Sequence, residues 1–357
     1  MAGQFDKATG QPTAAFDLAV FVGRFQPFHL GHLRVVEQAL ASAARVLVIV
    51  GSADAARRPD TAPFTAGERA AMIHDCLPIA DRERVVVRSL ADVGNLARWT
   101  AAVEALATEV GGVGARIALI GHAKDRSSGY LEAFPCFERI EADLYGPVSA
   151  TQVRRAYFDA DRAQADAFLA GEATGLLPAP VLAFLQAFQG QAAYGDMVEE
   201  QAFADRYRAA WATAPYPPIF VTADAVVTRA DKVLLIRRKR RPGMGLWALP
   251  GGFVEQDEPV LDAAVRELHE ETGLDVTPGD LCRAAVATKV FDAPTRDIRG
   301  RMITHATLFR LPASAAPPAI AAADDAEAAE WVALEALRRE TLYGDHFQII
   351  DALTGEG

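Results

Sequence analysis

Hydrophobic residues in the first half of the chain form short continuous runs that alternate with amphipathic segments. The runs cover residues 18–22, 46–50, 85–87, 117–120 and, more weakly, 137–140. The segments 33–43, 68–77 and 96–110 carry apolar residues at helical spacing, and Thr65 with Glu68 forms a capping box that opens the second of them. Buried strands that alternate with helices predict βαβ units and a parallel sheet, with ligands at the carboxyl ends of its strands.

The pattern changes in the middle of the chain. Residues 150–214 form an Ala-rich stretch of helical character, which ends in the string ATAPYPP at 212–218. Pro215, Pro217 and Pro218 cannot continue a helix. We therefore expect a domain boundary near residues 190–216.

The last part of the chain predicts a mixture of strands with few helices. Strands are expected at residues 219–228, 232–236, 281–291 and 302–311. One strong helix is expected at 260–271, and residues 312–325 are expected to form a surface loop rich in Pro and Ala. The sequence thus predicts an α/β domain at residues 1–190, a helical linker with a proline-rich boundary at 191–216, and an α+β domain at 217–357.

Composition and charge narrow the class of protein. The chain has 357 residues, which predicts about two domains, and its 51% of hydrophobic residues suffices for a sizeable core. The formal net charge of -11 argues against general electrostatic binding to nucleic acid or acidic lipid. No apolar run is long enough to span a bilayer, the first fifteen residues lack the apolar core of a signal peptide, and the three cysteines are widely spaced. We expect a cytoplasmic protein with reduced thiols that binds neither nucleic acid nor membranes.

The string GRFQPFHLGH follows the first predicted strand and begins at Gly23. His29 and His32 are three residues apart at the start of a helix, where free N–H groups and the helix dipole favour an anion. Gly23 and Gly31 allow the backbone to approach a ligand, and Arg24 can pair bidentately with phosphate oxygens. Two histidines alone are more often surface residues, but the arginine and both glycines in this position favour a phosphate site.

A second candidate phosphate site is the string SATQVR, which begins at Ser149. Ser149 stands at the expected N-cap of a helix, Thr151 adds a second hydroxyl, and Arg154 lies one turn into the helix. By itself this string is as consistent with a simple helix cap followed by a surface arginine as it is with a phosphate site. Together with the histidine motif, it predicts a phosphate bound by hydroxyls, helix N–H groups and a guanidinium.

These two strings resemble the nucleotidyltransferase superfamily, and the longer string GRFQPFHLGH is similar to the archaeal type of nicotinamide mononucleotide (NMN) adenylyltransferase. The segments PFTAGERAAMI (63–73) and GHAKDRSSGYLEAFP (121–135) agree with this family, as does the set of Asp92, Asn95 and Trp99. The resemblance covers roughly residues 16–160. It implies a Rossmann-like fold with a parallel sheet, and attack of the NMN phosphate on the α-phosphorus of ATP, giving NAD and pyrophosphate with Mg²⁺ bound to the ATP.

The same resemblance assigns roles to residues. It implies that His29, His32 and Arg154 are catalytic and contact the ATP phosphates. The residues implied in gripping the phosphates are Gly23, Arg24, Gly31, Ser149, Thr151 and Arg154. Asn95 and Trp99 match positions that the family uses around the nicotinamide ring. Ala150 departs from the Gly or Ser that many members of the resembled family carry at this position.

The third motif is GFVEQDEPVLDAAVRELHEETGL at residues 252–274. It matches G-x5-E-x7-R-E-U-x-E-E-x-G-U, where U is a bulky aliphatic residue, at Gly252, Glu258, Arg266, Glu267, Leu268, Glu270, Glu271, Gly273 and Leu274. Glu267 and Glu271 are four apart on one helical face with Glu270 beside them, and like charges that close cost stability unless a cation binds between them. A solvated acidic helix would explain RELHEE alone, but not the glycines and Glu258.

This motif resembles the box of the Nudix hydrolases, whose α+β fold presents it as a loop–helix–loop. The resemblance implies that Glu267, Glu270 and Glu271, with the Gly252 carbonyl, bind Mg²⁺, with Mn²⁺ as the alternative. Glu267 and Glu271 are implied as catalytic, while Glu258, Arg266 and Gly273 belong to the same box. The metals would activate water and neutralise the diphosphate of a nucleoside diphosphate linked to a second group.

Two further strings bear on the substrate. VLLIRRKRRPGMGLWALPGGF and YGDHFQIIDAL resemble Nudix enzymes that act on ADP-ribose. The basic run at residues 237–241 has two open interpretations, since it either borders the substrate phosphates or is partly just solvated.

The order of the two halves resembles the bifunctional NMN adenylyltransferase/Nudix hydrolase family over nearly the whole chain. That family implies ATP, NMN, NAD and ADP-ribose as small-molecule partners, with ADP-ribose hydrolysed to AMP and ribose 5-phosphate. Alternatives for the Nudix half are hydrolysis of NADH, another dinucleotide or an oxidised nucleoside triphosphate. From a different class, an ADP-ribose-sensing regulatory domain would show a broken box and a basic DNA-binding domain. A homo-oligomer stays open.

Overall fold

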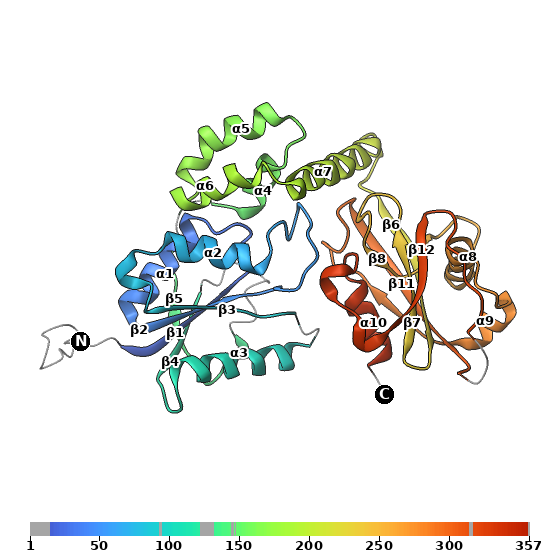
Figure 1. Cartoon of the computed structure of the whole chain (residues 1–357), viewed down its shortest axis with the longest axis horizontal. Helices are drawn as coiled ribbons and strands as arrows, with labels where there is room; N and C mark the ends of the chain where they lie inside the picture. Colours follow the sequence, from blue (N-terminus) through green and yellow to red (C-terminus); the bar gives the residue numbers. More distant parts are fainter. Residues whose placement is uncertain are drawn as a thin grey trace, which may run out of the picture. The chain divides into compact units, whose positions relative to one another are not determined.

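The structure is a computed structural model, and it describes residues 15–92, 95–121, 132–143, 146, 148–313 and 317–355. The chain divides into two compact units, Met1–Val198 and Glu199–Gly357. Figure 1 colours the first unit from blue to green and the second from yellow-green to red. The division falls inside the long helix α7 (Ala192–Ala210), within the segment that the sequence predicts as a linker.

The first unit is built on a parallel sheet of five strands in the order β3-β2-β1-β4-β5. Its strands are β1 (Phe16–Gly23), β2 (Ala43–Val50), β3 (Val85–Ser89), β4 (Ile117–Gly121) and β5 (Glu138–Glu141). Its sheet helices are α1 (Leu30–Ser42), α2 (Ala66–Cys76) and α3 (Leu96–Gly111), with a short 3-10 turn η1 at Ile79–Asp81. The predicted α/β parallel-sheet fold is confirmed.

Alternation along the strands divides the core of this unit into two layers. Ala19 and Phe21 of β1 face the cluster that includes residues of α1 and α2. Leu18 and Val20 face the opposite side, where they pack with Val103 and other residues of α3. Helices therefore cover both faces of the sheet, as parallel sheets require (Figure 1).

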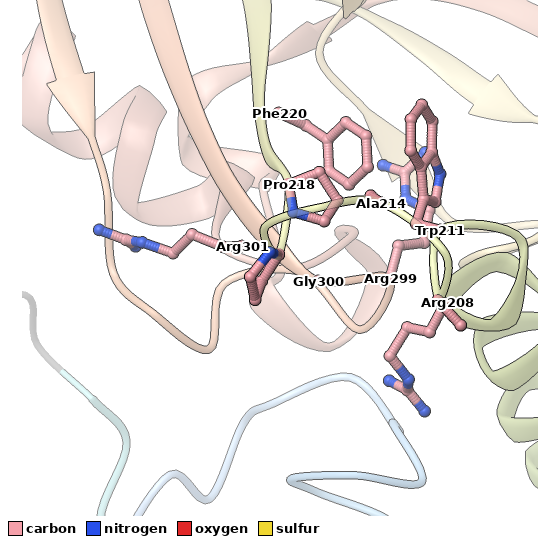
Figure 2. A pocket seen from close by; sticks show the side chains of 10 residues that line it. Arg208, Trp211, Ala214, Pro218, Phe220, Arg299, Gly300 and Arg301 are labelled. Carbon is pink, nitrogen blue, oxygen red and sulfur yellow. The ribbon is translucent and has the colours of Figure 1, made fainter.

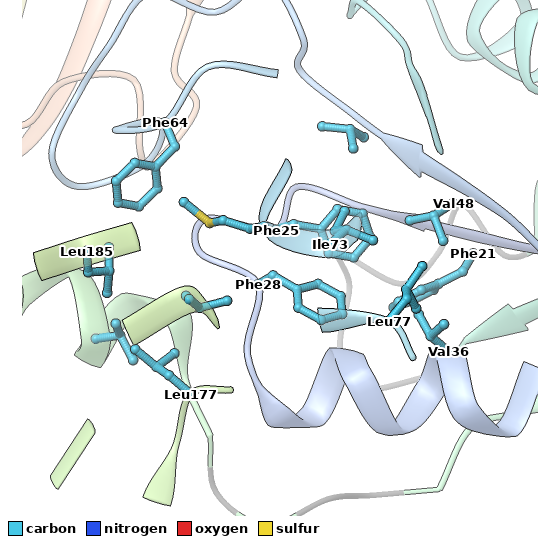
Figure 3. Close-up of a cluster of buried hydrophobic side chains, with 14 of the residues drawn as sticks. Phe21, Phe25, Phe28, Val36, Val48, Phe64, Ile73, Leu77, Leu177 and Leu185 are labelled. Carbon is cyan, nitrogen blue, oxygen red and sulfur yellow. The ribbon is translucent and has the colours of Figure 1, made fainter. Parts of the chain in front are cut away.

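A helical extension follows the sheet and contributes to the first of these layers. It contains α4 (Ala150–Tyr157), α5 (Arg162–Ala170), α6 (Ala179–Phe188) and the first part of α7, with the 3-10 turn η3 at Glu172–Gly175. Figure 3 shows Leu177 and Leu185 of this extension beside Phe28 and Phe64 of the sheet domain. The extension is thus part of the first unit's core.

The second unit holds a mixed sheet whose main path runs β10-β11-β6-β7-β12. Its long strands are β6 (Ile219–Arg229), β7 (Lys232–Arg238), β10 (Ala285–Phe291), β11 (Arg301–Leu311) and β12 (Ala326–Ala333). The short strands β8 (Trp247–Ala248) and β9 (Gly251–Phe253) pair with β7 and β6. In the part of this sheet that the structure describes, strands β6 and β11 pair in parallel, and the other strand pairings are antiparallel.

Helices pack on both faces of this sheet too. α8 (Val260–Thr272) packs through Ala264 and Leu268 on one face, and α10 (His346–Thr354) packs through Ile349 and Leu353 on the other. The remaining elements are α9 (Pro278–Ala284) and the 3-10 turns η4 (Leu334–Ala336) and η5 (Arg339–Thr341). The predicted α+β fold is confirmed, and within the described residues no helix is long and apolar enough to cross a membrane.

One local prediction was wrong in this unit, and several of its elements were missed. The strand predicted at 281–291 starts only at Ala285, because Thr277 caps α9 by accepting from the Asp280 N–H, and Pro278 occupies its first turn. Neither β12 nor α10 was predicted from the sequence. The short strands β8 and β9 were missed as well.

Candidate active sites

The turn after β1 is held by contacts that leave little freedom. Phe25 adopts a left-handed conformation with φ of 50°, and its ring lies against Gly23. A Cβ atom at Gly23 would come within 2.7 Å of the Phe25 ring, so only glycine fits there. Gln26 is buried, donates to the Phe64 carbonyl at 2.9 Å and accepts from the Phe64 N–H at 3.0 Å. Arg24 is exposed between these fixed neighbours.

His29 and His32 meet at the N-terminus of α1, whose second residue is Gly31. His29 is the N-cap, and each Nδ1 accepts from the backbone N–H of the other histidine at 3.3 Å. The two rings stack with centroids 3.6 Å apart and an angle of 17° between their planes. Burial, with the neighbouring His29, holds the pKa of His32 well below its usual value. Because Nδ1 accepts, the neutral His32 ring carries its proton on Nε2, which leaves this atom a hydrogen-bond donor.

Arg154 joins the second predicted motif to this turn. Its guanidinium is buried and donates to the carbonyls of Gln26 and Asp60, both at 2.7 Å, and to Thr151 Oγ1 at 3.1 Å. Burial and the nearby Arg24 lower the pKa of Arg154 to about 10, so it stays charged at neutral pH. Ser149 occupies the N-cap position of α4, but its side chain makes no capping hydrogen bond. The structure therefore brings Arg154 beside the histidine turn.

Arg69 organises the same edge of the sheet, and the sequence assigned it no role. Its side chain is 1% exposed and donates to the carbonyls of Arg24 at 2.8 Å, Gly51 at 2.7 Å and Ser52 at 3.1 Å. It thereby ties the ends of β1 and β2 together, while burial lowers its pKa to about 10. The signal was an arginine among apolar residues of the predicted helix, within the string PFTAGERAAMI.

The residues predicted around the nicotinamide ring have structural contacts. The Asn95 Oδ1 caps α3 by accepting from the N–H groups of Ala97 at 2.8 Å and Arg98 at 3.3 Å. Trp99 packs edge-on against Phe134, with ring centroids 5.8 Å apart. Most of the string at 121–135 lies outside the described residues, and contact with nicotinamide stays a prediction.

In the second unit, the predicted acidic helix is α8, and Glu267 lies directly over β9. A Cβ atom at Gly252 would come within 2.3 Å of Glu267 Oε1, so a side chain at this position would displace the Glu267 carboxylate. Gly273 ends α8 in the left-handed conformation with φ of 52°. The close approach fixes the Glu267 carboxylate beside the Gly252 backbone.

Arg266 is the centre of a network of charged groups. It makes two hydrogen bonds to Glu258, at 2.6 and 3.0 Å, and one to the Phe253 carbonyl at 3.2 Å. Its Nη1 also donates to Glu267 and Glu270, both at 2.9 Å. These carboxylates hold the pKa of Arg266 above its usual value. Arg266 therefore connects the loop before α8 to two of the predicted metal ligands.

Glu271 differs from its neighbours because it is buried. Its exposed fraction is 5%, and it accepts from the Gly251 N–H at 2.9 Å. Burial raises the pKa of Glu271 to about 8 and also raises that of Glu267, where Arg266 opposes the effect. All three predicted glutamate ligands line one cavity of about 480 Å³.

Comparison with known proteins gives a consistent result for each half. A family model described as Cytidylyltransferase-like matches residues 20–156, and one described as NUDIX domain matches residues 218–353. The nicotinamide/nicotinic acid mononucleotide adenylyltransferase of Acinetobacter baylyi is 38% identical over 145 residues, which are 40% of this chain and 77% of that protein. The ADP-ribose pyrophosphatase of Methanocaldococcus jannaschii is 39% identical over 130 residues, which are 36% of this chain and 70% of that protein.

Two solved structures match both halves of the chain. They are of a bifunctional NMN adenylyltransferase/ADP ribose pyrophosphatase from Francisella tularensis, one of them complexed with AMP and a manganese ion. Each is 34% identical and covers 96% of this chain and 99% of its own, with TM-scores of 0.85 and 0.84. This chain belongs to the bifunctional NMN adenylyltransferase/Nudix hydrolase family. The predicted family is confirmed.

The Nudix cavity also holds functional candidates that the sequence did not indicate. Asp224 is buried in β6 and accepts from Thr304 Oγ1 at 2.6 Å, while burial raises its pKa. His346 is buried at the start of α10, and its Nδ1 accepts from the Leu249 N–H at 2.8 Å. Burial lowers the pKa of His346 to about 3. An acidic residue inside an apolar strand was the available signal for Asp224.

The basic run before the Nudix box lies partly on this cavity. Arg238, Arg240 and Arg241 are among its lining residues. Arg238 stacks over the Tyr343 ring at 4.5 Å, Arg240 pairs with Asp325 at 3.0 Å, and Arg241 pairs with Glu199 and Glu200. Of the two interpretations, the position at the cavity favours the one in which part of the run borders the substrate.

The carboxylates of the Nudix half have the chemistry to hold a divalent cation, although their side chains are turned to protein partners. Among the described residues, no group of three or more His, Cys, Asp or Glu side chains is arranged to hold a metal ion. The reason is that Arg266 Nη1 lies between Glu267 and Glu270, while Glu271 faces the Gly251 N–H. Hard oxygen donors on one cavity wall, one of them desolvated, fit Mg²⁺ or Mn²⁺ once Arg266 releases two of them.

Proposed function

We propose that the first unit transfers the adenylyl group of ATP to NMN, giving NAD and pyrophosphate, and that the second unit hydrolyses ADP-ribose to AMP and ribose 5-phosphate. One observation carries this proposal. The chain holds both motifs, and a solved enzyme that is named for both activities aligns with 96% of it at 34% identity. Both reactions act on pyridine nucleotides or their breakdown products.

In the first reaction, a phosphate oxygen of NMN attacks the α-phosphorus of ATP, and the bond to the pyrophosphate oxygen breaks. This displacement needs no nucleophile from the protein, only correct positioning and positive charge where negative charge develops. We propose that the Nε2–H groups of His29 and His32 donate to the ATP phosphates at the α1 N-terminus. Arg24 and Arg154 would supply the positive charge on the pyrophosphate side, and Ser149 and Thr151 their hydroxyl groups.

In the second reaction, water adds across the diphosphate so that one phosphate leaves with each nucleoside or sugar product. Nudix hydrolases require a divalent cation, which when bound supplies an activated water and neutralises the diphosphate charge. We propose Mg²⁺, held by Glu267, Glu270 and Glu271 with the Gly252 carbonyl. Glu267 and Glu270 would leave Arg266 Nη1 to bind the ion, while the Gly251 N–H orients Glu271.

The test uses two variants of the full chain that serve as controls for each other. The purified protein is incubated with ATP and NMN, or with ADP-ribose, in the presence of Mg²⁺, and the products are separated by chromatography. We expect His32→Ala to abolish NAD formation and keep ADP-ribose hydrolysis, and Glu267→Gln to do the reverse. If the unmodified protein leaves ADP-ribose intact but cleaves NADH or another diphosphate, the substrate assignment of the second unit is wrong.

A further inference from the structure

The segment that joins β7 to β8 places three arginines on the wall of the Nudix cavity. Those that line the cavity are Arg238, Arg240 and Arg241. We call residues 238–246 the arginine loop. Two backbone hydrogen bonds close its base, since Arg238 donates to the Leu246 carbonyl at 2.9 Å and Gly245 donates to the Arg238 carbonyl at 2.8 Å. The tip of the loop, residues 240–244, extends beyond these bonds and needs other contacts to hold its arginines in place.

A buried carboxylate of α7 holds the tip of the arginine loop. Glu200 is 5% exposed, and its Oε1 accepts from the Gly243 N–H at 2.7 Å. Its Oε2 accepts from the Arg241 guanidinium at 3.2 Å. Burying a carboxylate is costly unless charged or N–H groups surround it, and both of these partners belong to the loop. The Glu200 side chain and the tip of the loop therefore fix each other.

The other side of the tip packs on the Tyr343 ring. Gly243 has φ of 72°, and a Cβ atom at this position would overlap the Tyr343 ring. The Arg238 guanidinium lies over the same ring, 4.5 Å from its centroid, and its Nε donates to the Pro242 carbonyl at 2.7 Å. The tip therefore lies between Glu200 and Tyr343, and its position determines where the Arg238 guanidinium stands on the cavity wall.

The part of α7 that carries Glu200 is itself fixed to the second unit. Arg208, two turns further along the helix, donates to the Ile298 carbonyl at 2.6 Å. Trp211, just after the helix, packs edge-on against Phe220 of β6 with ring centroids 5.2 Å apart. Figure 2 shows Arg208, Trp211 and Phe220 among the residues around one small cavity. These contacts give the Glu200 carboxylate a defined position from which it can hold the loop.

We propose that Glu200 is a positioning residue of the hydrolase, which holds the arginine loop in place for the diphosphate of the substrate. The proposal rests on the hydrolase function proposed above for the second unit. Among the described residues, the arginines of the loop line the cavity and Glu200 does not, so its carboxylate acts through the loop. A loop that is already ordered binds an anion more tightly, because less freedom is lost on binding. Glu200 lies before the matched segment 218–353, so the hydrolase depends on a helix outside its Nudix domain.

The experiment compares Glu200→Ala with Glu200→Gln and with two controls, Glu199→Ala and Gln201→Ala, in the full chain. Glu199 pairs with the same Arg241 but keeps 70% of its side chain exposed, and Gln201 is a buried neighbour on the same helix. We expect Glu200→Ala to raise the KM for ADP-ribose roughly tenfold, with kcat nearly unchanged because α8 is untouched. Glu200→Gln keeps an acceptor for the Gly243 N–H and should recover part of the loss. Both controls should match the unmodified protein.

A role in stability alone would give a different result, because a smaller folded fraction lowers kcat and leaves KM unchanged. Hydrogen exchange of residues 239–246, measured by mass spectrometry in EDTA, tests the loop without turnover. We expect faster exchange in Glu200→Ala than in the unmodified protein and both controls, and we expect ADP-ribose to slow exchange only where Glu200 is present or replaced by Gln.

Equal exchange in Glu200→Ala and the unmodified protein, or an unchanged KM despite faster exchange, overturns the proposal. Absence of ADP-ribose hydrolysis by every protein refutes the proposed function instead. The exchange data then decide the role of Glu200 by themselves. Loss of the protection by ADP-ribose in Glu200→Ala supports that role, and equal protection in both proteins overturns it.

Discussion

The burial of the His346 side chain predicts that the second unit loses stability in mild acid. The side chain is 5% exposed, and its Nδ1 accepts the Leu249 N–H at 2.8 Å, so a proton on this atom would break the hydrogen bond. Burial lowers the folded-state pKa to about 3 from the model-peptide value of 6.5. A depressed pKa favours the folded protein fully above pH 6.5, and this advantage is lost as the pH falls toward 3.

The magnitude follows from the distance between the assay pH and the unfolded-state pKa. At pH 5 the unfolded histidine is protonated and the folded one is not, so stability falls by roughly 1.36 kcal/mol for each of about 1.5 pH units, or about 2 kcal/mol. This value is insensitive to the folded-state pKa as long as that stays below about 4. His346→Asn places Oδ1 near the position of Nδ1, keeps the acceptor and cannot titrate.

The assay is urea unfolding at pH 7 and pH 5 in a Trp99→Phe background. The remaining tryptophans, Trp211, Trp247 and Trp331, all belong to the second unit, so fluorescence follows that unit alone. We expect the protein with His346 to lose about 2 kcal/mol more than His346→Asn between the two pH values. Other titrating groups, including Glu271 with its opposite effect, are common to both proteins and cancel in the comparison.

One outcome would refute this reasoning, and a second variant tests the hydrogen bond. Equal pH dependence of the two proteins would show that His346 is not held neutral by burial, which would refute the reasoning. His346→Leu tests the hydrogen bond separately. It leaves the buried Leu249 N–H without its acceptor and should cost about 1–3 kcal/mol at both pH values.

Three further predictions concern the two sites. Gly252→Ala would place Cβ within 2.3 Å of Glu267 Oε1 and displace this carboxylate. We therefore expect ADP-ribose hydrolysis to fall about 100-fold, with little change in the urea midpoint. Gly279→Ala is the control and should keep full activity, because the nearest atom to its Cβ would be 3.7 Å away. Arg69→Met leaves three backbone carbonyls without their donor. Calorimetry should therefore show that the first unit loses about 3 kcal/mol or more of stability, and NAD formation should be lost. Arg88 is exposed, so Arg88→Met is the control and should retain NAD formation. Mn²⁺ at about 100 times its Kd should add about 2.7 kcal/mol to the second unit, and an equal gain in Glu267→Gln would contradict the assigned ligand.

The hydrophobic pattern predicted the fold well wherever the local sequence and the tertiary contacts agree. Strands β1, β2 and β4 of the first unit contain continuous apolar runs, and α8 has a strong apolar stripe, so their places in the structure match the pattern. The strand β12 reads AEAAEWVA, which favours a helix by propensity. It is extended because it pairs with β7 along most of its length, and that partner lies about 90 residues away in sequence.

In the candidate sites, too, residues of short local motifs were predicted, and residues that depend on distant contacts were missed. Histidines, glutamates and glycines at fixed short spacings were visible in the sequence, and the structure places His29 with His32 and Glu267 with Glu271 as those spacings predict. Arg69, Asp224 and His346 were missed because their importance comes from burial against distant backbone. No local pattern indicates that an arginine will meet carbonyls from two other strands.

In the turn after β1, the lack of space for a side chain and the left-handed backbone conformation occur at two different residues. Glycine stands at position 23, where space requires it, whereas the left-handed conformation falls on Phe25, two residues later. In evolutionary terms the two positions are coupled, because a larger residue at 23 is tolerated only when the ring at 25 is lost. Relatives that change Gly23 should therefore also change Phe25, and a library that varies both positions together should recover pairs that no single substitution reaches.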